Sequence, residues 1–379
     1  MKNKNWDYIT LYNVVDKGSS NISLNKVKDE EGDYPLYSAK GFYKNISFYH
    51  QEKEYIAIIK DGAGIGRLSV HPSNSSVVGT MQYLIPKDGF DIMFIRYFLQ
   101  GINFNQYKQG ATIPHIYFKD YKSELVPNIS IIEQKRIVAE IDRLFAKIDK
   151  AIALAEESLK QAENLLLSAI KQIFDKGEEK GWSKQKFKDF ALLRHGHQFR
   201  KFDYVESGIP VVKIGQCPPG NKLDLSKCNF IDVSRKNEFS DDLIKKDDLL
   251  MALTGGTLGK VTWVEDDYGI IVQNYRVGNF FTDESKFLKR FLMYSLMSPI
   301  FQSLMYSKIN VAAQPNIGKE EIENLEFIVP SLEEQKKIVE QLDGLTIKLK
   351  KNQLILEDQL NYLKNLKSSI LSKAFSGEL

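Results

Sequence analysis

Two glycine-rich stretches carry residue types that could bind a nucleotide phosphate. Gly62-Ala-Gly-Ile-Gly66-Arg67 resembles a dinucleotide-binding turn, but Arg67 stands where that turn needs its third glycine. Thr254-Gly-Gly-Thr-Leu-Gly259-Lys260-Val261 resembles a phosphate-binding loop, but Thr254 replaces its first glycine and Val261 its Ser or Thr. Neither stretch predicts nucleotide chemistry, whereas glycine amides beside a single cation suit contact with DNA phosphates.

Other catalytic signatures in the sequence are incomplete. Cys217-Pro-Pro-Gly220 does not match the Asn/Asp-Pro-Pro-aromatic signature of amino-methyltransferases. His195 and His197 lack a third ligand at a telling spacing, and Cys217 and Cys228 are too few for a zinc site. We therefore expect no catalytic residue, no metal site and no cofactor bound by this chain. Two ordinary thiols fit a reducing cytoplasm.

Polar segments in both halves of the chain contain residue types that contact DNA. Cations, amides and aromatic rings interleave in residues 40–44 and 194–201. Residues 108–115 and 308–316 form a matched pair of polar segments, whose Asn and Gln side chains could pair with adenine edges. The alternative for each segment is a solvated turn or a hydrogen-bonded loop. The predicted DNA-binding residues are Lys40, Tyr43, Lys44, Lys60, Arg67, Lys108, Gln109, Thr112, His115, Arg194, His197, Gln198, Arg200, Lys201, Thr254, Thr257, Lys260, Lys308, Asn310, Gln314 and Asn316.

The elements that must position these segments occur twice. Residues 133–138, Glu-Gln-Lys-Arg-Ile-Val, return as Glu-Gln-Lys-Lys-Ile-Val at 334–339, and the regions that follow share about fifteen identities over roughly 45 aligned positions. Ile58–Arg67 parallels Met251–Lys260 more loosely. The predicted order is two globular domains, each followed by a long helix, with boundaries at 1–130, 131–177, 178–330 and 331–379.

Each long segment is typical of a capped helix. Ser130 with Glu133, and Ser331 with Glu334, form capping-box patterns. Apolar residues at heptad spacing favour two helices that pair as a coiled coil, the alternative being that each packs only on its own domain. The predicted pairing residues are Ile141, Leu144, Ile148, Leu165, Leu342, Leu345, Leu349, Leu363 and Leu366.

The repeat constrains how the halves are arranged. Both globular domains are predicted as mixed α/β (α+β) with many short strands. If a pseudo-twofold axis relates the halves, the two helices must run antiparallel, and each would be a rod of about 65 Å, close to two turns of duplex DNA. Because the domains differ in sequence, we expect them to read different half-sites of an asymmetric target that is split by a fixed gap.

Bulk properties are those of an ordinary globular chain. The 379 residues carry a net charge of +3, which leaves DNA binding open. No apolar run suggests a membrane span, and the lysine-rich start has no hydrophobic stretch that would indicate a signal peptide. The weak charge slightly favours one alternative, a protein-binding scaffold with two ligand domains on a coiled rod. A stand-alone enzyme is the third hypothesis.

The motifs resemble those of the specificity subunits of Type I restriction-modification systems. The likeness rests on Val126-Pro127 through Val138, on Ile328–Val339, and on the terminal stretch Leu371–Leu379. It recurs twice at the right spacing and so covers the whole chain. The first domain begins almost at Met1, so the extra N-terminal helix of some members is not expected.

This resemblance implies two target-recognition domains, 1–130 and 178–330, and conserved spacer helices that act as a ruler. It implies binding to double-stranded DNA, to two adenine methyltransferase subunits that use S-adenosylmethionine, and to restriction subunits that hydrolyse ATP with Mg²⁺. None of those cofactors would bind this chain, which would be a non-catalytic cytoplasmic subunit that directs DNA methylation and restriction.

Overall fold

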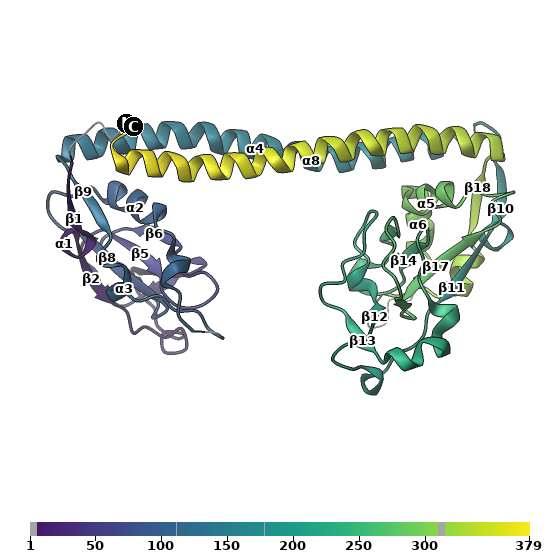
Figure 1. Cartoon of the computed structure of the whole chain (residues 1–379), viewed down its shortest axis with the longest axis horizontal. Coiled ribbons are helices and arrows are strands. Elements are labelled where there is room, and N and C mark those ends of the chain that lie inside the picture. The colour runs from purple at the N-terminus through teal and green to yellow at the C-terminus, as the bar shows by residue number, and fades with distance from the viewer. Residues whose placement is uncertain (1–5, 111, 178, 310–314) are drawn as a thin grey trace. The chain divides into compact units, whose positions relative to one another are not determined.

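The computed structural model describes the chain except for residues 1–5, 111, 178 and 310–314. The chain divides into two compact units (Figure 1). Unit 1 comprises Met1–Glu156 with Leu356–Leu379, and unit 2 comprises Glu157–Ile355. Each unit therefore contains one globular domain and parts of both long helices. No helix among the described residues is long and apolar enough to span a membrane.

Unit 1 contains a four-stranded sheet in the order β2-β8-β5-β6, a three-stranded sheet β4-β3-β7 and the pair β1-β9. All neighbours are antiparallel except β3 and β7, which run parallel. The strands are β1 (Asp7–Thr10), β2 (Val15–Ser19), β3 (Tyr34–Ser38), β4 (Gly41–Ile46), β5 (Tyr55–Ile59), β6 (Leu68–His71), β7 (Ser76–Val77), β8 (Met81–Pro86) and β9 (Leu125–Asn128). Its short helices are α1 (Leu11–Val14), α2 (Ile92–Gly101) and α3 (Phe118–Tyr121).

Unit 2 repeats this topology strand by strand: β11-β17-β14-β15, β13-β12-β16 and β10-β18, again with one parallel pair, β12 and β16. The predicted mixed α/β repeat is confirmed. The strands are β10 (Ser183–Lys186), β11 (Ala191–His195), β12 (Ile209–Val212), β13 (Asn229–Ile231), β14 (Leu249–Ala252), β15 (Val261–Trp263), β16 (Val272–Gln273), β17 (Val277–Thr282) and β18 (Glu326–Val329). Its short helices are α5 (Lys289–Met297), α6 (Pro299–Tyr306) and α7 (Lys319–Glu323).

The two long helices are α4 (Ile131–Asp175) and α8 (Leu332–Ser376). Short 3-10 helices lie in several loops, at Phe104–Tyr107, Phe187–Asp189, Lys201–Asp203, Ile214–Gln216 and Gly255–Thr257. A longer 3-10 segment spans Val233–Asp242. The serine part of each predicted cap is present, because Glu133 N donates to Ser130 Oγ and Glu334 N to Ser331 Oγ. The Glu133 and Glu334 carboxylates also accept hydrogen bonds, from Arg136 and Lys180 respectively.

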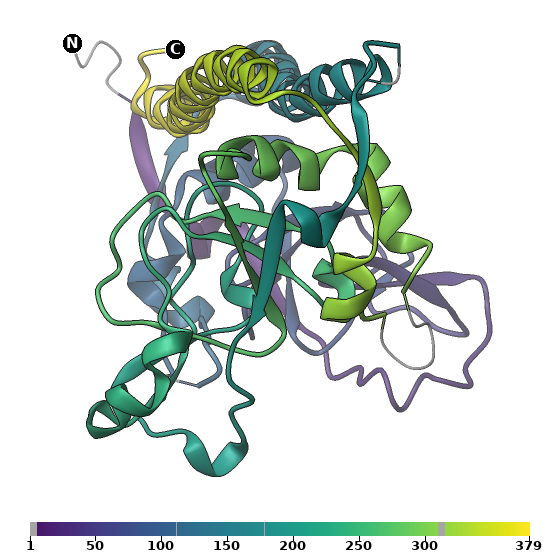
Figure 2. The ribbon, with the colours of Figure 1, turned by 90° about the vertical axis from the view of Figure 1, so that its right-hand side faces the viewer.

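Apolar strands form the centre of each unit. Every residue of β5 and of β14 is buried, as expected for a strand covered on both faces. In unit 1, α2 packs its apolar face on the four-stranded sheet. In unit 2, α5 lies between the corresponding sheet and α8 (Figures 1 and 2). The short helix thus connects the sheet to the long helix in both units.

A buried glutamine joins each long helix to its domain. Gln134, fully buried, accepts from Asp91 N at 2.8 Å and donates to Gly89 O and Ile129 O. Gln335, also buried, accepts from Leu288 N at 2.9 Å and donates to Pro330 O at 3.1 Å. Because these bonds satisfy backbone groups just before α2 and α5, the two glutamines fix the long helices in the same way.

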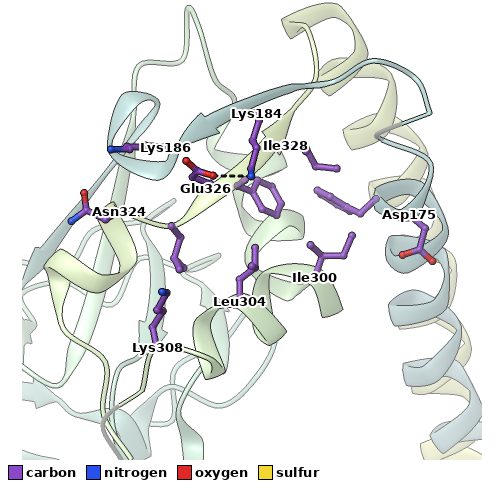
Figure 3. Close-up of a pocket in the computed structure, with 12 residues that line it drawn as sticks. Asp175, Lys184, Lys186, Ile300, Leu304, Lys308, Asn324, Glu326 and Ile328 are labelled. Carbon is purple, nitrogen blue, oxygen red and sulfur yellow. Dashed lines mark ion pairs between the residues drawn. The ribbon is translucent and has the colours of Figure 1, made fainter.

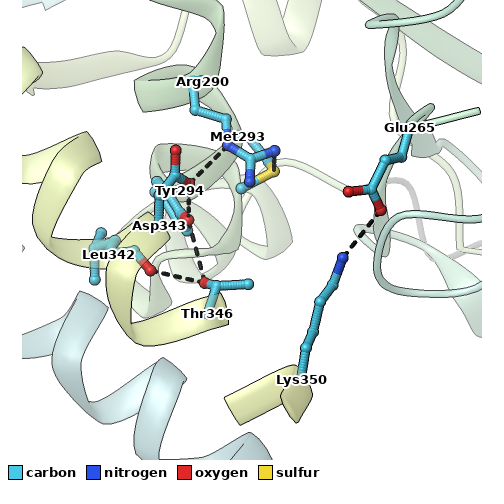
Figure 4. Close-up of polar contacts among 8 residues, drawn as sticks. All are labelled: Glu265, Arg290, Met293, Tyr294, Leu342, Asp343, Thr346 and Lys350. Atoms are coloured by element: carbon cyan, nitrogen blue, oxygen red, sulfur yellow. Dashed lines mark hydrogen bonds and ion pairs between the residues drawn. The ribbon is translucent and has the colours of Figure 1, made fainter. Parts of the chain in front are cut away.

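Further along each long helix, an aspartate receives a tyrosine hydroxyl. Tyr97 donates to Asp142 in unit 1. In unit 2, Tyr294 and Arg290 both donate to Asp343 (Figure 4), and Lys350 pairs with Glu265 at 3.0 Å. Burial, together with the bond to Asp343, raises the pKa of Tyr294 to about 12, so its hydroxyl stays protonated and can donate.

The long helices run antiparallel within each unit, as predicted. In unit 1, Arg136 donates to Leu379 O at 3.0 Å and Lys367 forms an ion pair with Asp149. The buried residues on this side are Ile137, Ile141, Phe145, Ile148, Ile370, Leu371 and Ala374, with Leu144, Leu363 and Leu366 partly buried. In unit 2 the shared core includes Leu166, Ile170, Phe174, Ile338 and Leu342, and Leu345 and Leu349 are partly buried.

One predicted pairing residue is wrong. Leu165 is 52 % exposed, while Leu166 and Ile170 face the core of unit 2. A straight α-helix has 3.6 residues per turn, so a strict seven-residue repeat drifts around its surface. Along α4 the buried positions advance by eleven residues, from Ala155 to Leu166, which places Leu165 on the outer face.

We predict that Gln335→Leu lowers the free energy of unfolding by about 1–3 kcal/mol, because Leu288 N and Pro330 O would be left without a buried partner. Urea unfolding of the full chain measures this change. Gln341→Leu is the matched control, because Gln341 is exposed on the same helix, and it should stay within about 0.5 kcal/mol of the parent. Equal effects of the two substitutions would contradict the role assigned to Gln335.

Candidate nucleic-acid interface

The two glycine-rich stretches form equivalent turns, between β5 and β6 in unit 1 and between β14 and β15 in unit 2. Gly62 and Gly66 have φ of +95° and +80°, and Gly255 and Gly259 have φ of +75° and +80°. Glycine is favoured at such angles. A Cβ on Gly66 would also lie 2.8 Å from Phe104 Cβ. The glycine spacing is therefore a requirement of the turn, which explains why it fits neither nucleotide motif.

Most of the turn amides that could approach a phosphate are already used. Gly62 N donates to Pro114 O and Gly66 N to Ile59 O, both at 2.9 Å. Gly255 N donates to Pro315 O and Gly259 N to Ala252 O, also both at 2.9 Å. The expected phosphate contact through the amides of these four glycines is therefore wrong. What the turns offer to DNA is the cation that follows each one, Arg67 or Lys260.

In each unit a later segment of the chain pairs with the glycine turn, and the pairing is the same in both units. In unit 1, Ile116 N donates to Lys60 O at 2.9 Å, and Asp61 forms a β-bridge with His115. In unit 2, Ile317 N donates to Leu253 O at 3.1 Å, and Thr254 forms a β-bridge with Asn316. His115 and Asn316 therefore occupy equivalent positions, each between a proline and an isoleucine.

Other predicted residues of unit 1 lie close to this turn. Arg67 Nη2 donates to Ala39 O at 3.5 Å, which brings the turn to the β3–β4 hairpin. Lys40 and Tyr43 are exposed on that hairpin, and Lys44 donates to Lys28 O at 3.0 Å. Lys60 pairs with Asp61 at 2.9 Å. The structure thus gathers three predicted segments of unit 1 around one turn.

Lys108 and Thr112 border a shallow hollow of about 510 Å³ beside the same turn, with Gly62 and Pro114 also lining it. Gln109 is less accessible for recognition, because its amide donates to Asp120 at 2.9 Å. Its backbone pairs with that of His115 in both directions.

In unit 2 the predicted segment 197–201 lies on the surface. Gln198, Arg200 and Lys201 are exposed, and the His197 ring packs edge-on against Phe239 with centroids 4.9 Å apart. Arg200 N donates to Asp203, whose carboxylate also accepts from Arg235 at 2.8 Å. These bonds lower the pKa of Asp203, the bond from Arg200 most, so the carboxylate stays ionised and fixes the segment.

Burial contradicts two predicted contacts in unit 2 and restricts a third. The Arg194 side chain is only partly buried: its guanidinium lies 4.6 Å from the Phe281 ring centroid, its Nε is buried, and one Nη donates to Leu243 O at 3.5 Å. The hydroxyl oxygens of Thr254 and Thr257 are also buried, since the 3-10 turn at Gly255 directs them inward. Neither threonine hydroxyl can reach DNA in this conformation, and the Arg194 contact stays a prediction.

Lys308 follows α6 in the chain. It lines a groove of about 860 Å³ between α6 and the β10–β18 pair, with Lys184 and Lys186 on the same rim (Figure 3). Asn310 and Gln314 fall outside the described residues. Asn316 is exposed. The polar segment of unit 2 is matched to that of unit 1 at Asn316.

Sequence reasoning missed three residues of this surface. Asp61 Oδ1 accepts from His115 Nδ1 at 2.7 Å, a contact between residues far apart in sequence that only the fold brings together. Phe42 and Phe202 are 62 % and 80 % exposed beside predicted cations. The position of Phe42 within one cationic segment, and of Phe202 directly after the other, was the signal that could have found them. Among the described residues, no group of three or more His, Cys, Asp or Glu side chains is placed to hold a metal ion.

The fold resembles solved chains of known systems. A chain from a structure titled for the assembly and conformational transition of the type I R-M system aligns with a TM-score of 0.70 at 16 % identity, covering 99 % of this chain and 98 % of that one. The HsdS subunit from Thermoanaerobacter tengcongensis aligns with a TM-score of 0.51 at 15 % identity, covering 99 % and 97 %. At these identities the likeness shows the fold alone.

Curated relatives match in sequence over part of their length. The MjaVIII specificity subunit of a Type I restriction enzyme from Methanocaldococcus jannaschii is 25 % identical over 254 residues, which are 62 % of this chain and 59 % of that protein. The EcoBI specificity subunit from Escherichia coli is 24 % identical over 177 residues, 47 % of this chain and 37 % of that protein. The chain thus spans less than two thirds of the length of these relatives.

A family model for the Type I restriction modification DNA specificity domain matches twice, at residues 3–161 and 179–357. Each match begins with one globular domain and continues into the long helix that follows it, which is the repeat seen in the fold. The chain therefore belongs to the Type I restriction-modification DNA specificity family.

Proposed function

We propose that this chain recognises an asymmetric, bipartite DNA target and directs adenine methyltransferase and restriction subunits to it. The observation that carries the proposal is a pair of units with the same strands and the same turn, but with different residues exposed at equivalent positions. Two similar readers with different surfaces would read two different half-sites. Membership of the DNA specificity family supports this assignment.

The exposed residues divide into two kinds of contact. We assign the exposed cations Lys40, Arg67, Arg200 and Lys260 to phosphates, where they would set the register on the duplex. Donor and acceptor groups such as His115 and Asn316 would read base edges in the major groove. In this proposal the four cations contribute affinity, and His115 and Asn316 contribute selectivity.

Catalysis would belong to the partners. We propose that two methyltransferase subunits bind S-adenosylmethionine, that restriction subunits bind ATP and Mg²⁺, and that this chain binds none of these cofactors. As a DNA-directed subunit it would act in the cytoplasm. Its relatives are named specificity subunits of Type I restriction enzymes, which supports assigning recognition to this chain and catalysis to other subunits.

Replacing residues 1–130 with the corresponding domain of a relative should change one half of the methylated target and leave the other half and the gap unchanged. The complex with its methyltransferase subunits is expressed, and methylated adenines are mapped by single-molecule sequencing of host DNA. The parent complex provides the reference motif. A change in both halves would contradict independent reading by the two units.

Lengthening both long helices should lengthen the gap. Seven residues inserted between Glu156 and Glu157, and seven between Ile355 and Leu356, fall at the unit boundaries and preserve a heptad seam. Each insertion adds about 10 Å of helix, or about three base pairs of duplex. The same mapping should show both half-sites unchanged and a longer gap. An equal insertion in the exposed loop at Asp266 should leave the gap as it was, and an unchanged gap in the helix variant would refute the ruler.

Removing two exposed cations should weaken binding to all sequences equally. For Arg200→Ala combined with Lys201→Ala, we expect the slope of log K against log salt to fall by about 0.9 for each phosphate that the variant no longer neutralises. Fluorescence anisotropy with labelled duplex measures the slope for the assembled complex. Lys176→Ala, an exposed cation at the end of α4, is the control. A slope that stays at the parent value would place residues 200 and 201 away from the DNA.

A further inference from the structure

The equivalent turns of the two units share a backbone frame, which we define by two hydrogen bonds that recur in both units. The glycine amide at 62 or 255 donates to the proline carbonyl at 114 or 315, at 2.9 Å in both units. The isoleucine amide at 116 or 317 donates back across the turn, at 2.9 and 3.1 Å. Glycine, proline and isoleucine thus recur at the positions that build the frame.

The residues that face each other across this frame differ between the two units. Unit 1 has Asp61 opposite His115, and unit 2 has Thr254 opposite Asn316. His115 has 35 % of its side chain exposed, and Asn316 is exposed. The backbone frame is thus the same in both units, while the polar pair differs and one residue of each pair lies at the surface. This is the arrangement expected of a recognition position.

The pair in unit 1 has a defined polarity. A carboxylate only accepts hydrogen bonds, so His115 Nδ1 must donate to Asp61 Oδ1, at 2.7 Å. Burial alone would raise the pKa of Asp61, but the bonds from His115 and Lys60 lower it overall, so the carboxylate is ionised and keeps this role. The other ring nitrogen, Nε2, remains for a ligand.

We propose that residues 115 and 316 are specificity determinants that set the base read by each unit at one position of its half-site, and that residues 61 and 254, which lie opposite them, are positioning residues. The inference rests on the proposed function. With Nδ1 engaged, His115 presents the single atom Nε2, which suits a one-point contact with a base edge in the major groove. The Asn316 side chain carries both an amide donor and an amide acceptor, which suits the N6 and N7 groups of adenine.

The test exchanges the two pairs between the frames. Asp61→Thr with His115→Asn places the unit 2 pair in unit 1, and Thr254→Asp with Asn316→His does the reverse. Each variant is assembled with its methyltransferase subunits, and methylation is sequenced on a plasmid library with randomised target sites. The first variant should raise the preference for adenine at one position of the first half-site by about ten-fold or more. The second should alter one position of the second half-site only.

Asp88→Thr is the matched control, because it makes the same exchange in an exposed turn between β8 and α2, and it should leave the motif as in the parent. If an exchanged pair prevents assembly, His115→Asn alone keeps Asp61 and its ion pair with Lys60, and it is read by the same assay. Loss of base preference at one position of the first half-site supports the inference. An unchanged motif in the exchange variants, whether or not methylation is weaker, overturns it.

The parent complex separates this inference from the proposed function. If the parent methylates a bipartite motif and the exchanges leave that motif intact, residues 115 and 316 are not determinants, although the function stands. If the parent methylates no split motif, the proposed function itself fails.

Discussion

A buried amide side chain at the start of each long helix is the constraint on which the rest of each unit depends. Gln134 and Gln335 satisfy backbone donors and acceptors that would otherwise be unpaired in the core. Turning or sliding the helix would leave those groups without partners, at a cost that few surface contacts could offset. The helix therefore leaves its domain in one direction, and the sheet, α2 or α5, and the glycine turn are all fixed relative to it within the unit.

The fold separates the residues that build the recognition surface from those that vary on it. Gly62, Pro114 and Ile116 have counterparts of the same type in unit 2, and their contacts hold the turn. Asp61 and His115 have counterparts of other types, although the backbone around them is equivalent. A frame held by glycine angles and backbone bonds tolerates such exchanges because the exchanged side chains do not support it. New specificities could then arise without cost to the fold.

The repeat, the fold class and both long helices were predictable, because each is written in local patterns such as the capping serines Ser130 and Ser331 and the heptad spacing of apolar residues. The predictions that were wrong or missing depended on contacts between residues distant in sequence, or on the gradual rotation of a helix face along its length. Leu165 was misplaced because the helix repeat drifts from a strict heptad. Asp61 was missed because its partner lies on another strand, and the amides of the glycine turns are occupied by carbonyls that no local pattern reveals.

Charge explains why such a chain would work only in a complex. Its net charge is +3, and several cations are paired internally, among them Lys60 with Asp61, Arg235 with Asp203 and Lys350 with Glu265. Positive and negative residues nearly balance, with 52 Lys and Arg against 49 Asp and Glu, so the chain as a whole offers little net attraction to phosphates, whose contacts supply most sequence-independent affinity for DNA. We infer that the isolated chain binds DNA weakly and that partner subunits add the missing phosphate contacts. On this inference, stable binding would require both half-sites and the partners together.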